Sequence, residues 1–228
     1  EVMAISRSFE EAFQKALRMA NEQLFGFDWR YGDMTKYEII EELKNPTPDR
    51  IQTIAHVLNN PDKDISMTVD EIHRHSHIDK WFLYKMENIK SFATDHLNKL
   101  NINSTQNITP ATLLQAKKYG FSDKYIGHLT NLTETCISEL RKKYNLYPVV
   151  KQIDTVAAEF PCYTNYLYLT YNGTYHDIEF NENGIMVLGS GVYRIGSSVE
   201  FDWCAVNCIR QLRESGYKTI MVNYNPET

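Results

Sequence analysis

The clearest pattern of apolar positions lies near the C-terminal end of the chain, where it predicts a strand, a glycine loop, a helix and a second strand. The apolar run Ile185–Leu188 is typical of a buried parallel strand. Ser197 and Glu200 have the spacing of a capping box. The apolar residues that follow share one helix face: Phe201, Cys204, Ala205, Cys208, Ile209 and Leu212. Gly216 ends the helix and residues 218–223 form a second buried strand, which predicts a Rossmann-like βαβ unit.

A second amphipathic helix is predicted near the start of the chain. Ser8 and Glu11 have capping-box spacing for a helix that runs to about Asn21. Its apolar residues form one stripe: Phe9, Phe13, Ala16, Leu17 and Ala20. This helix is typical of the tail of a neighbouring domain.

The middle of the chain is predicted to be all helical. Helix starts are indicated at Thr35, at Thr47 with Pro48 in the first turn, at Thr68 with Glu71, and at Thr109 with Pro110. The clearest helix runs from about Asp79 to beyond Phe92, with buried candidates at Trp81, Phe82, Met86, Ile89 and Phe92. Shorter helices are predicted over residues 111–119, 123–129 and 134–144.

After Pro148 the pattern changes to β structure. Residues 166–171 and 175–180 are rich in tyrosine and flank Asn172-Gly173, which predicts a β-hairpin. We expect this hairpin to connect the helical part to the βαβ unit.

Composition narrows the class of protein. Hydrophobic residues make up 43% of the chain, enough for globular cores. A net charge of -5 and the lack of a basic cluster argue against a nucleic-acid partner. The sequence contains neither a run of 18 apolar residues nor a signal-peptide pattern, so we expect no membrane partner and a cytoplasmic location.

The cysteines and histidines give no strong metal signal. Cys204 and Cys208 share the apolar face of the last helix and are predicted to be small core residues, not ligands. His73, His75 and His77 invite a zinc interpretation, but without further ligands nearby we expect a solvated helix end. No metal site and no disulfide are predicted.

The glycine loop leaves alternatives open. Gly189, Gly191 and Gly196 read GxGxxxxG, which departs from the dinucleotide motif, and Ser197 stands where a P-loop needs lysine. A NADP-linked Rossmann oxidoreductase therefore remains an alternative, although Asn223 stands where that class needs an acidic residue. A tight turn with glycines for backbone geometry alone fits equally well.

The residues themselves are more specific. GSGVYRIGSSVEFDWCAV followed by YKTIMVNYNPET resembles the start of the second synthetase half of the carbamoyl-phosphate synthetase large subunit. EVMAISRSFEEAFQKALRM resembles the end of the first ATP-grasp half. IDKWFLYKM, GFSDKYI and VKQIDTVAAEFP resemble the helical domain between the halves. The resemblance spans the chain in the family's order.

The resemblance implies a multidomain α plus α/β fold. Residues 1–30 would end the first ATP-grasp half, and residues 31–155 would form an all-helical oligomerisation domain. Residues 156–184 would be the connecting hairpin, and residues 185–228 the start of a Rossmann-like pre-ATP-grasp βαβ unit. The expected partners are the remaining ATP-grasp domains, the glutaminase part and further copies in a homo-oligomer.

The activity that the resemblance implies is that of an ATP-dependent ligase. The complete enzyme makes carbamoyl phosphate from bicarbonate, ammonia or glutamine, and two ATP with Mg, for pyrimidine, arginine or urea synthesis. ATP and Mg would bind outside this fragment, which would hold no cofactor and be inactive alone. A non-catalytic assembly module is the remaining alternative.

Candidate site residues follow from the same resemblance. Glu1, Glu200 and Glu227 match glutamates that line the internal carbamate tunnel of the family. Arg194 and the glycine loop at Gly189, Gly191 and Gly196 adjoin a helix N-terminus, where positive partial charge favours anions.

The sequence departs from the common pattern in two places. Ser6 stands where the family usually has glycine. Val192 and Tyr193 replace a Pro-Asn pair, which resembles the cytosolic multienzyme of animal pyrimidine synthesis, with the mitochondrial urea-cycle enzyme as the alternative.

Overall fold

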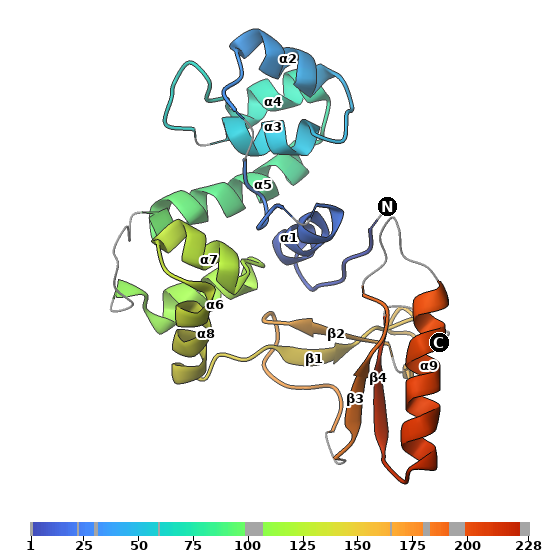
Figure 1. Cartoon of the computed structure of the whole chain (residues 1–228). Coiled ribbons are helices and arrows are strands. Elements are labelled where there is room, and N and C mark those ends of the chain that lie inside the picture. The colour runs from blue at the N-terminus through green and yellow to red at the C-terminus, as the bar shows by residue number, and fades with distance from the viewer. Residues whose placement is uncertain are drawn as a thin grey trace. The chain divides into compact units, whose positions relative to one another are not determined.

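The computed structural model describes the chain from residue 2 to residue 223, except for residues 22, 30–31, 59, 99–106, 165, 180–182 and 192–198 and the side chains of residues 199–201. The chain divides into two compact units (Figure 1). The helical unit is Arg7–Tyr147, and the β unit combines Glu1–Ser6 with Pro148–Thr228. None of the described helices is long and apolar enough to cross a membrane.

The helical unit is built from short helices. They are α1 Phe9–Ala20, α2 Lys36–Lys44, α3 Arg50–Val57, α4 Val69–Ser76, α5 Lys80–Phe92, a π-helical turn Ala93–Leu97, α6 Pro110–Lys118, α7 Asp123–Thr130 and α8 Glu134–Lys143. Helix α2 packs against α3 and α4, α5 packs against α4 and α1, and α7 packs against α8. Figure 1 shows α2, α3 and α4 gathered as one lobe of this unit.

Local capping fixes most of the helix starts. Thr35 and Thr68 form reciprocal capping boxes with Glu38 and Glu71, as predicted. Asp79 caps α5, and Thr109 caps α6 with Pro110 in its first turn.

The start of α3 was predicted incorrectly. The helix begins at Arg50 after Asp49, not at Thr47. The Thr47 hydroxyl donates to the side chain of Glu42, and its N–H donates to the carbonyl of Asn45, at 2.8 Å. These contacts hold Thr47 in the turn after α2, so the new helix starts later.

The core of the helical unit lines the inner faces of α2 to α8. Fully buried apolar residues include Ile39, Leu43, Ile54, Ile72, Leu83, Ile89, Leu113, Ile126 and Ile137. Helix α5 buries Met86, Ile89 and Phe92 as predicted, but Trp81 and Phe82 are 53% and 43% exposed. Leu83 takes the buried place in the first turn, while Trp81 and Phe82 lie against the half-buried ring of Phe9, with ring centroids 5.5 Å apart.

Helix α1 buries a polar face. Its buried residues are Glu10, Glu11, Gln14 and Leu17, whereas the predicted stripe of Phe9, Phe13 and Ala16 is half-buried and Ala20 is exposed. The Glu10 carboxylate accepts from Asn88 at 3.1 Å and pairs with Lys85 at 3.4 Å. Helix α1 therefore docks through polar side chains with partners on α5 as well as through its apolar stripe.

Two further polar side chains of α1 reach the end of α6. Gln14 is fully buried and donates from Nε2 to the carbonyl of Tyr119 at 2.8 Å, while its Oε1 accepts from the Phe27 N–H at 3.2 Å. Arg18 donates from Nη1 to the carbonyl of Gly120 at 2.8 Å. These carbonyls at the end of α6 would otherwise lack helical partners. Burial lowers the pKa of Arg18 to about 10, against the opposing charge of Glu11.

A second polar network joins α6, α7 and α8. The Lys117 ammonium lies 2.9 Å from Asp123 and donates to the carbonyl of Phe121 at 2.8 Å. Arg141 donates to the other carboxylate oxygen from Nη2 at 3.0 Å and from Nε at 3.1 Å. Burial alone raises the pKa of Asp123, but Lys117 and Arg141 outweigh it and hold that pKa below the ordinary 3.8.

The β unit contains two small sheets. Strands β1 Val149–Gln152 and β2 Leu167–Thr170 pair antiparallel. Strands β3 Ile185–Leu188 and β4 Thr219–Val222 pair parallel, with α9 Val199–Glu214 between them in the chain. The predicted order of strand, helix and strand is confirmed. Its small core joins Val187 to Ala205 and Ile209, with Leu212 and Met221 packed at the edge.

The predicted hairpin around Asn172-Gly173 is wrong. Strand β2 pairs with β1, and residues 175–179 form no strand, while Phe180 lies outside the described residues. Asp177 accounts for the difference: its carboxylate accepts from Lys151 at 2.8 Å and from the Gln152 N–H at 2.9 Å. Together with the Asp177 N–H, which donates to the carbonyl of Val150 at 3.0 Å, these contacts attach the segment to β1 without a second strand.

The predicted core position of Cys204 and Cys208 is also wrong, because both are exposed. The β3–β4 pair is only two strands wide, and α9 covers it with the neighbouring stripe of Ala205 and Ile209. The two cysteines lie at the border of that narrow contact.

We predict that Gly120→Ala destabilises the helical unit by about 2–3 kcal/mol. Gly120 has φ +84, and a Cβ there would lie 2.8 Å from the Cα of Glu11. Urea unfolding followed by helical circular dichroism measures the effect. Two variants, Gly216→Ala and Gly32→Ala, serve as controls. Gly216 also has a positive φ, +86, but a Cβ there would have no neighbour within 4 Å, and Gly32 has neither a positive φ nor such a neighbour. If all three variants lower the free energy of unfolding equally, the contact with Glu11 is not the cause of the loss in Gly120→Ala.

Asp123→Asn should cost about 3 kcal/mol near neutral pH, because it leaves Lys117 and Arg141 without their charge partner. The pKa of Asp123 is lowered in the folded state, so its contribution is complete above the unfolded pKa of about 3.9 and is lost as pH falls through the lower folded pKa. Urea unfolding is measured between pH 3 and pH 7. The difference in the free energy of unfolding between wild type and variant should become smaller only below about pH 4.

The exposed pair of Asp70 and Lys80 supplies the control, because Asp70→Asn should change stability little. If Asp70→Asn lowers the free energy of unfolding as much as Asp123→Asn does, burial of the Asp123 network is not the reason for its contribution to stability.

Candidate functional site

The candidate site lies at the carboxyl edge of the parallel strands. Because β3 and β4 run in the same direction, their carboxyl ends meet at one edge, the usual ligand edge of parallel sheets. The Gly189 N–H donates to the carbonyl of Val222 at 2.8 Å, so the backbone pairing extends into the glycine loop. Helix α9 begins after this loop.

Three polar side chains meet at this edge, and we call them the Asp202 triad: Ser190, Asp202 and Asn223. The Asp202 Oδ1 atom accepts from the Ser190 hydroxyl at 3.1 Å and from the Asn223 amide at 2.9 Å. Ser190 follows β3, Asp202 lies in the first turn of α9, and Asn223 follows β4. One carboxylate oxygen thus joins the ends of all three elements.

Gly189 is required by close approach. A Cβ at this position would lie 2.7 Å from Oδ1 of Asn223 and 3.4 Å from the Cβ of Ala205. Gly189 therefore lets the Asn223 side chain reach Asp202 across the strand ends. Gly191 has no atom within 4 Å of such a Cβ and is exposed, so sterics do not demand glycine there.

The predicted site residues are only partly described. Glu200 lies in the first turn of α9, with its side chain outside the described residues. Glu1, Arg194, Gly196 and Glu227 also lie outside them. Their shared role in a carbamate route stays a prediction.

Ser190 and Asp202 were not predicted as site residues, and Asn223 was considered only as a residue that disfavours an oxidoreductase. A usable signal was present, because Ser190 and Asn223 come one or two residues after the two parallel strands. Polar residues at such positions gather at one edge. The pairing with Asp202 was hidden because Asp202 sits 12 and 21 residues away along the chain.

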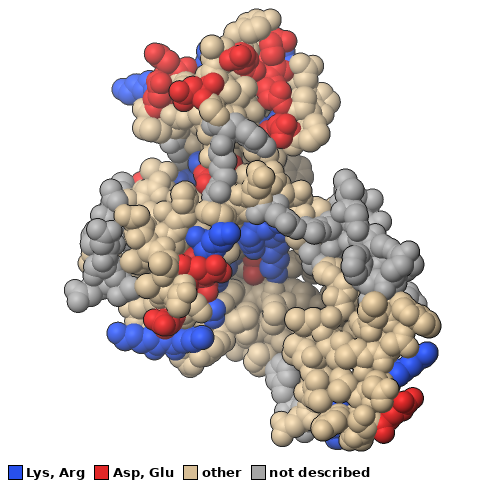
Figure 2. All heavy atoms as spheres, in the orientation of Figure 1, with Lys and Arg blue, Asp and Glu red and all other residues tan. Residues whose placement is uncertain are grey.

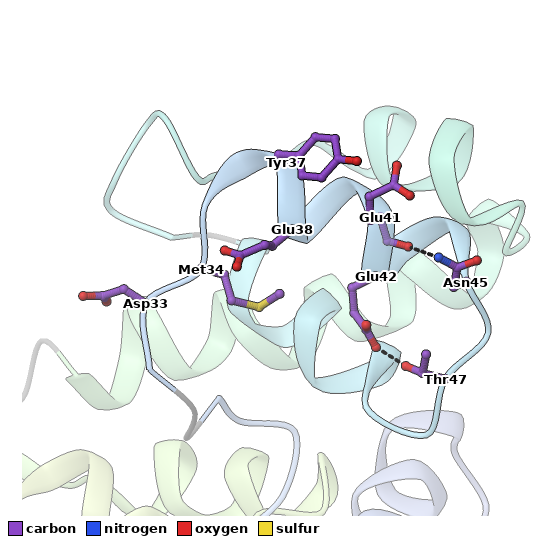
Figure 3. Close-up of a pocket in the computed structure, with 8 residues that line it drawn as sticks. All are labelled: Asp33, Met34, Tyr37, Glu38, Glu41, Glu42, Asn45 and Thr47. Atoms are coloured by element: carbon purple, nitrogen blue, oxygen red, sulfur yellow. Dashed lines mark hydrogen bonds between the residues drawn. The ribbon is translucent and has the colours of Figure 1, made fainter.

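A hollow of the helical unit lies beside α2 (Figure 3). It encloses about 390 Å³ and is lined by Asp33, Met34, Tyr37, Glu38, Glu41, Glu42, Asn45 and Thr47. Figure 2 shows acidic side chains gathered over this lobe. Glu38 caps α2, Glu41 pairs with Lys44 at 2.8 Å, and Glu42 accepts from Thr47. These carboxylates serve helix ends, so the hollow is not assigned as the site.

The histidines lie at the C-terminal end of α4, as predicted. His73 Nδ1 lies 2.7 Å from the carbonyl of Ile78, and His77 ends the helix with φ 57. Over the described part of the chain, no three His, Cys, Asp or Glu side chains are grouped to hold a metal ion.

Comparison with known proteins gives two family matches. Residues 1–145 match the carbamoyl-phosphate synthetase large chain, oligomerisation domain, and residues 181–228 match the carbamoyl phosphate synthase preATP-grasp domain. The candidate edge, from Ser190 to Asn223, falls within the second match.

Similar proteins match along the whole chain. It is 52% identical to multifunctional protein CAD of Squalus acanthias and 53% identical to mitochondrial carbamoyl-phosphate synthase [ammonia] of Rattus norvegicus. It is 50% identical to multifunctional protein pyr-3 of Neurospora crassa. Each match covers 100% of this chain but only 10%, 15% and 12% of the respective relative.

Proposed function

This chain belongs to the carbamoyl-phosphate synthetase large-chain family, and we propose that it forms the centre of a full-length synthetase. It would supply the oligomerisation domain and the start of the second preATP-grasp domain, a Rossmann-like unit. The observation that carries this proposal is the presence of both family matches in one chain, in that order. The oxidoreductase alternative is not supported, since relatives at 50–53% identity are synthetases or multifunctional proteins.

The proposed activity of the full-length protein is ATP-dependent synthesis of carbamoyl phosphate from bicarbonate, ammonia or glutamine, and two ATP. We place ATP and Mg outside this chain, because its two matches are to an oligomerisation domain and a preATP-grasp domain and do not include an ATP-grasp domain. The relatives include multifunctional and mitochondrial enzymes at similar identity, so the subfamily and the location stay predictions.

The proposed contribution of the helical unit is assembly. The domain boundaries at residues 31, 156 and 185 belong to this proposal, as do the homo-oligomer and contacts with the ATP-grasp and glutaminase parts. The name of the matched oligomerisation domain supports it.

The proposed contribution of the β unit is part of the carbamate route, with Glu1, Glu200 and Glu227 along its wall. Glu200 lies in the first turn of α9, and Glu227 follows Asn223 by four residues. A carbamate passing this edge would meet the positive end of the α9 dipole, with Arg194 nearby in the chain. Exclusion of water along such a route protects an intermediate that water destroys.

Glu200→Ala in the full-length protein should uncouple ATP hydrolysis from product formation, because carbamate that leaves the route decays before it is phosphorylated. The measurement is the number of ATP molecules hydrolysed per carbamoyl phosphate formed, which should rise at least about threefold. Glu214→Ala changes an exposed glutamate at the other end of α9 and is the matched control. A ratio that stays the same in Glu200→Ala refutes the role of Glu200.

The isolated chain should make no carbamoyl phosphate from ATP, bicarbonate and ammonia. The reason is that the family's ATP sites are placed in ATP-grasp domains that its two matches do not include. Product formation is followed by trapping labelled bicarbonate in carbamoyl phosphate, with the full-length protein as the positive control. Synthesis above background by the isolated chain would overturn this division of labour.

A further inference from the structure

We infer that Asp202 is a positioning residue that holds the three chain segments at the carboxyl edge of β3 and β4 in register. The inference rests on the proposed function, because two of these segments carry glutamates of the proposed carbamate route. It assigns Asp202 no contact with the intermediate. Asp202 acts on the route through Ser190 and Asn223.

The geometry supplies the first step. Asp202 Oδ1 accepts two hydrogen bonds, from the Ser190 hydroxyl at 3.1 Å and from the Asn223 amide at 2.9 Å. The two donor residues follow different strands, Ser190 after β3 and Asn223 after β4. All three residues are half-buried. Hydrogen bonds to an ionised acceptor are stronger than those between neutral groups, so a carboxylate suits this junction.

The positions along the chain supply the second step. Asp202 comes two residues after Glu200, and Asn223 comes four residues before Glu227. Ser190 lies within the glycine loop, between Gly189 and Gly191. A displacement of Asp202 would therefore act on all three segments together.

Close packing supplies the third step. The missing Cβ of Gly189 leaves room for Asn223, whose side chain would lie 2.7 Å from a Cβ there. The Gly189 N–H also pairs with the Val222 carbonyl at 2.8 Å. The loop and the end of β4 thus touch through backbone and side chain, so the orientation of Asn223 sets the path of the loop.

The test uses the full-length protein with Asp202→Ala, Ser190→Ala and Asn223→Ala. Asp202→Ala should raise the ATP hydrolysed per carbamoyl phosphate at least about threefold, because small displacements at a reaction route have large kinetic effects. Ser190→Ala and Asn223→Ala should each raise the ratio less, and combining either with Asp202→Ala should add little, since all three act through one network. Amide hydrogen exchange in peptides covering residues 189–191 should become faster in Asp202→Ala.

Arg213→Ala is the matched control. Arg213 Nε donates to the Thr219 hydroxyl at 3.0 Å, so this variant also removes a side-chain bond between α9 and β4, but at the opposite end of the strand. The ratio should stay at the wild-type value. If Asp202 served stability alone, Asp202→Ala would lower the rates of ATP hydrolysis and of carbamoyl phosphate formation together, and the ratio of the two would stay unchanged.

The outcomes separate this inference from the proposed function. If Asp202→Ala exchanges its amide hydrogens faster but hydrolyses the same number of ATP molecules per carbamoyl phosphate, the inference is overturned. The carbamate route is then still tested separately by Glu200→Ala. An unchanged ratio in Glu200→Ala with a raised ratio in Asp202→Ala removes the role of Glu200 and supports Asp202. If Asp202→Ala does not fold, the two milder variants decide: raised ratios support the inference, and unchanged ratios overturn it.

Discussion

The helical unit depends on a constraint that begins in α1. The fully buried amide of Gln14 bonds both the Tyr119 carbonyl, 105 residues further along the chain, and the Phe27 N–H, 13 residues further along, so α1 must dock in a pose that satisfies both groups. A buried amide left without partners is costly, so Gln14 and Arg18 fix the position of α1 more sharply than apolar contact alone would. Gly120 permits the approach, because any side chain there would meet the α1 backbone. The Tyr119 and Gly120 carbonyls are thereby bonded by another helix, while carbonyls of α6 itself accept from the N–H groups of Gly120 and Phe121.

The β unit relies on polar contacts for a different reason. Its described parallel pair buries only Val187, Ala205 and Ile209 as a core, and α9 covers one face. The other face exposes apolar side chains at Met186, Leu188, Ile220 and Val222. Parallel sheets are normally covered on both faces, so apolar burial contributes little order here. The hydrogen bonds of the Asp202 triad therefore contribute more to the positions of the strand ends than they would beside a large apolar core.

The sequence predicted features that are decided locally. The caps at Thr35, Thr68, Asp79 and Thr109 were found because cap and helix lie within a few residues. The order of β3, α9 and β4 followed from periodicity in the same way. The wrong start of α3 has local causes, since Thr47 bonds Glu42 and Asn45. Other features that were missed involve distant partners: Glu10 and Gln14 are buried by contacts with α5 and α6, and Asp177 bonds to β1 where a hairpin ladder was predicted. No local pattern records such partners, and the same limit hid Asp202 at the site.

The order of the units along the chain connects these two constraints. The β unit is discontinuous, since Glu1–Ser6 groups with Pro148–Thr228 and the helical unit is inserted between them. An unstructured insertion of that length would impose an entropic cost on bringing its ends together, whereas a folded insertion has already met that cost. The docking of α1, which starts two residues after Arg7, therefore fixes the entry to the insertion. Folding of the helical unit therefore lowers the entropic cost of assembling the β unit, even though the chemistry proposed for that edge involves none of the helical residues.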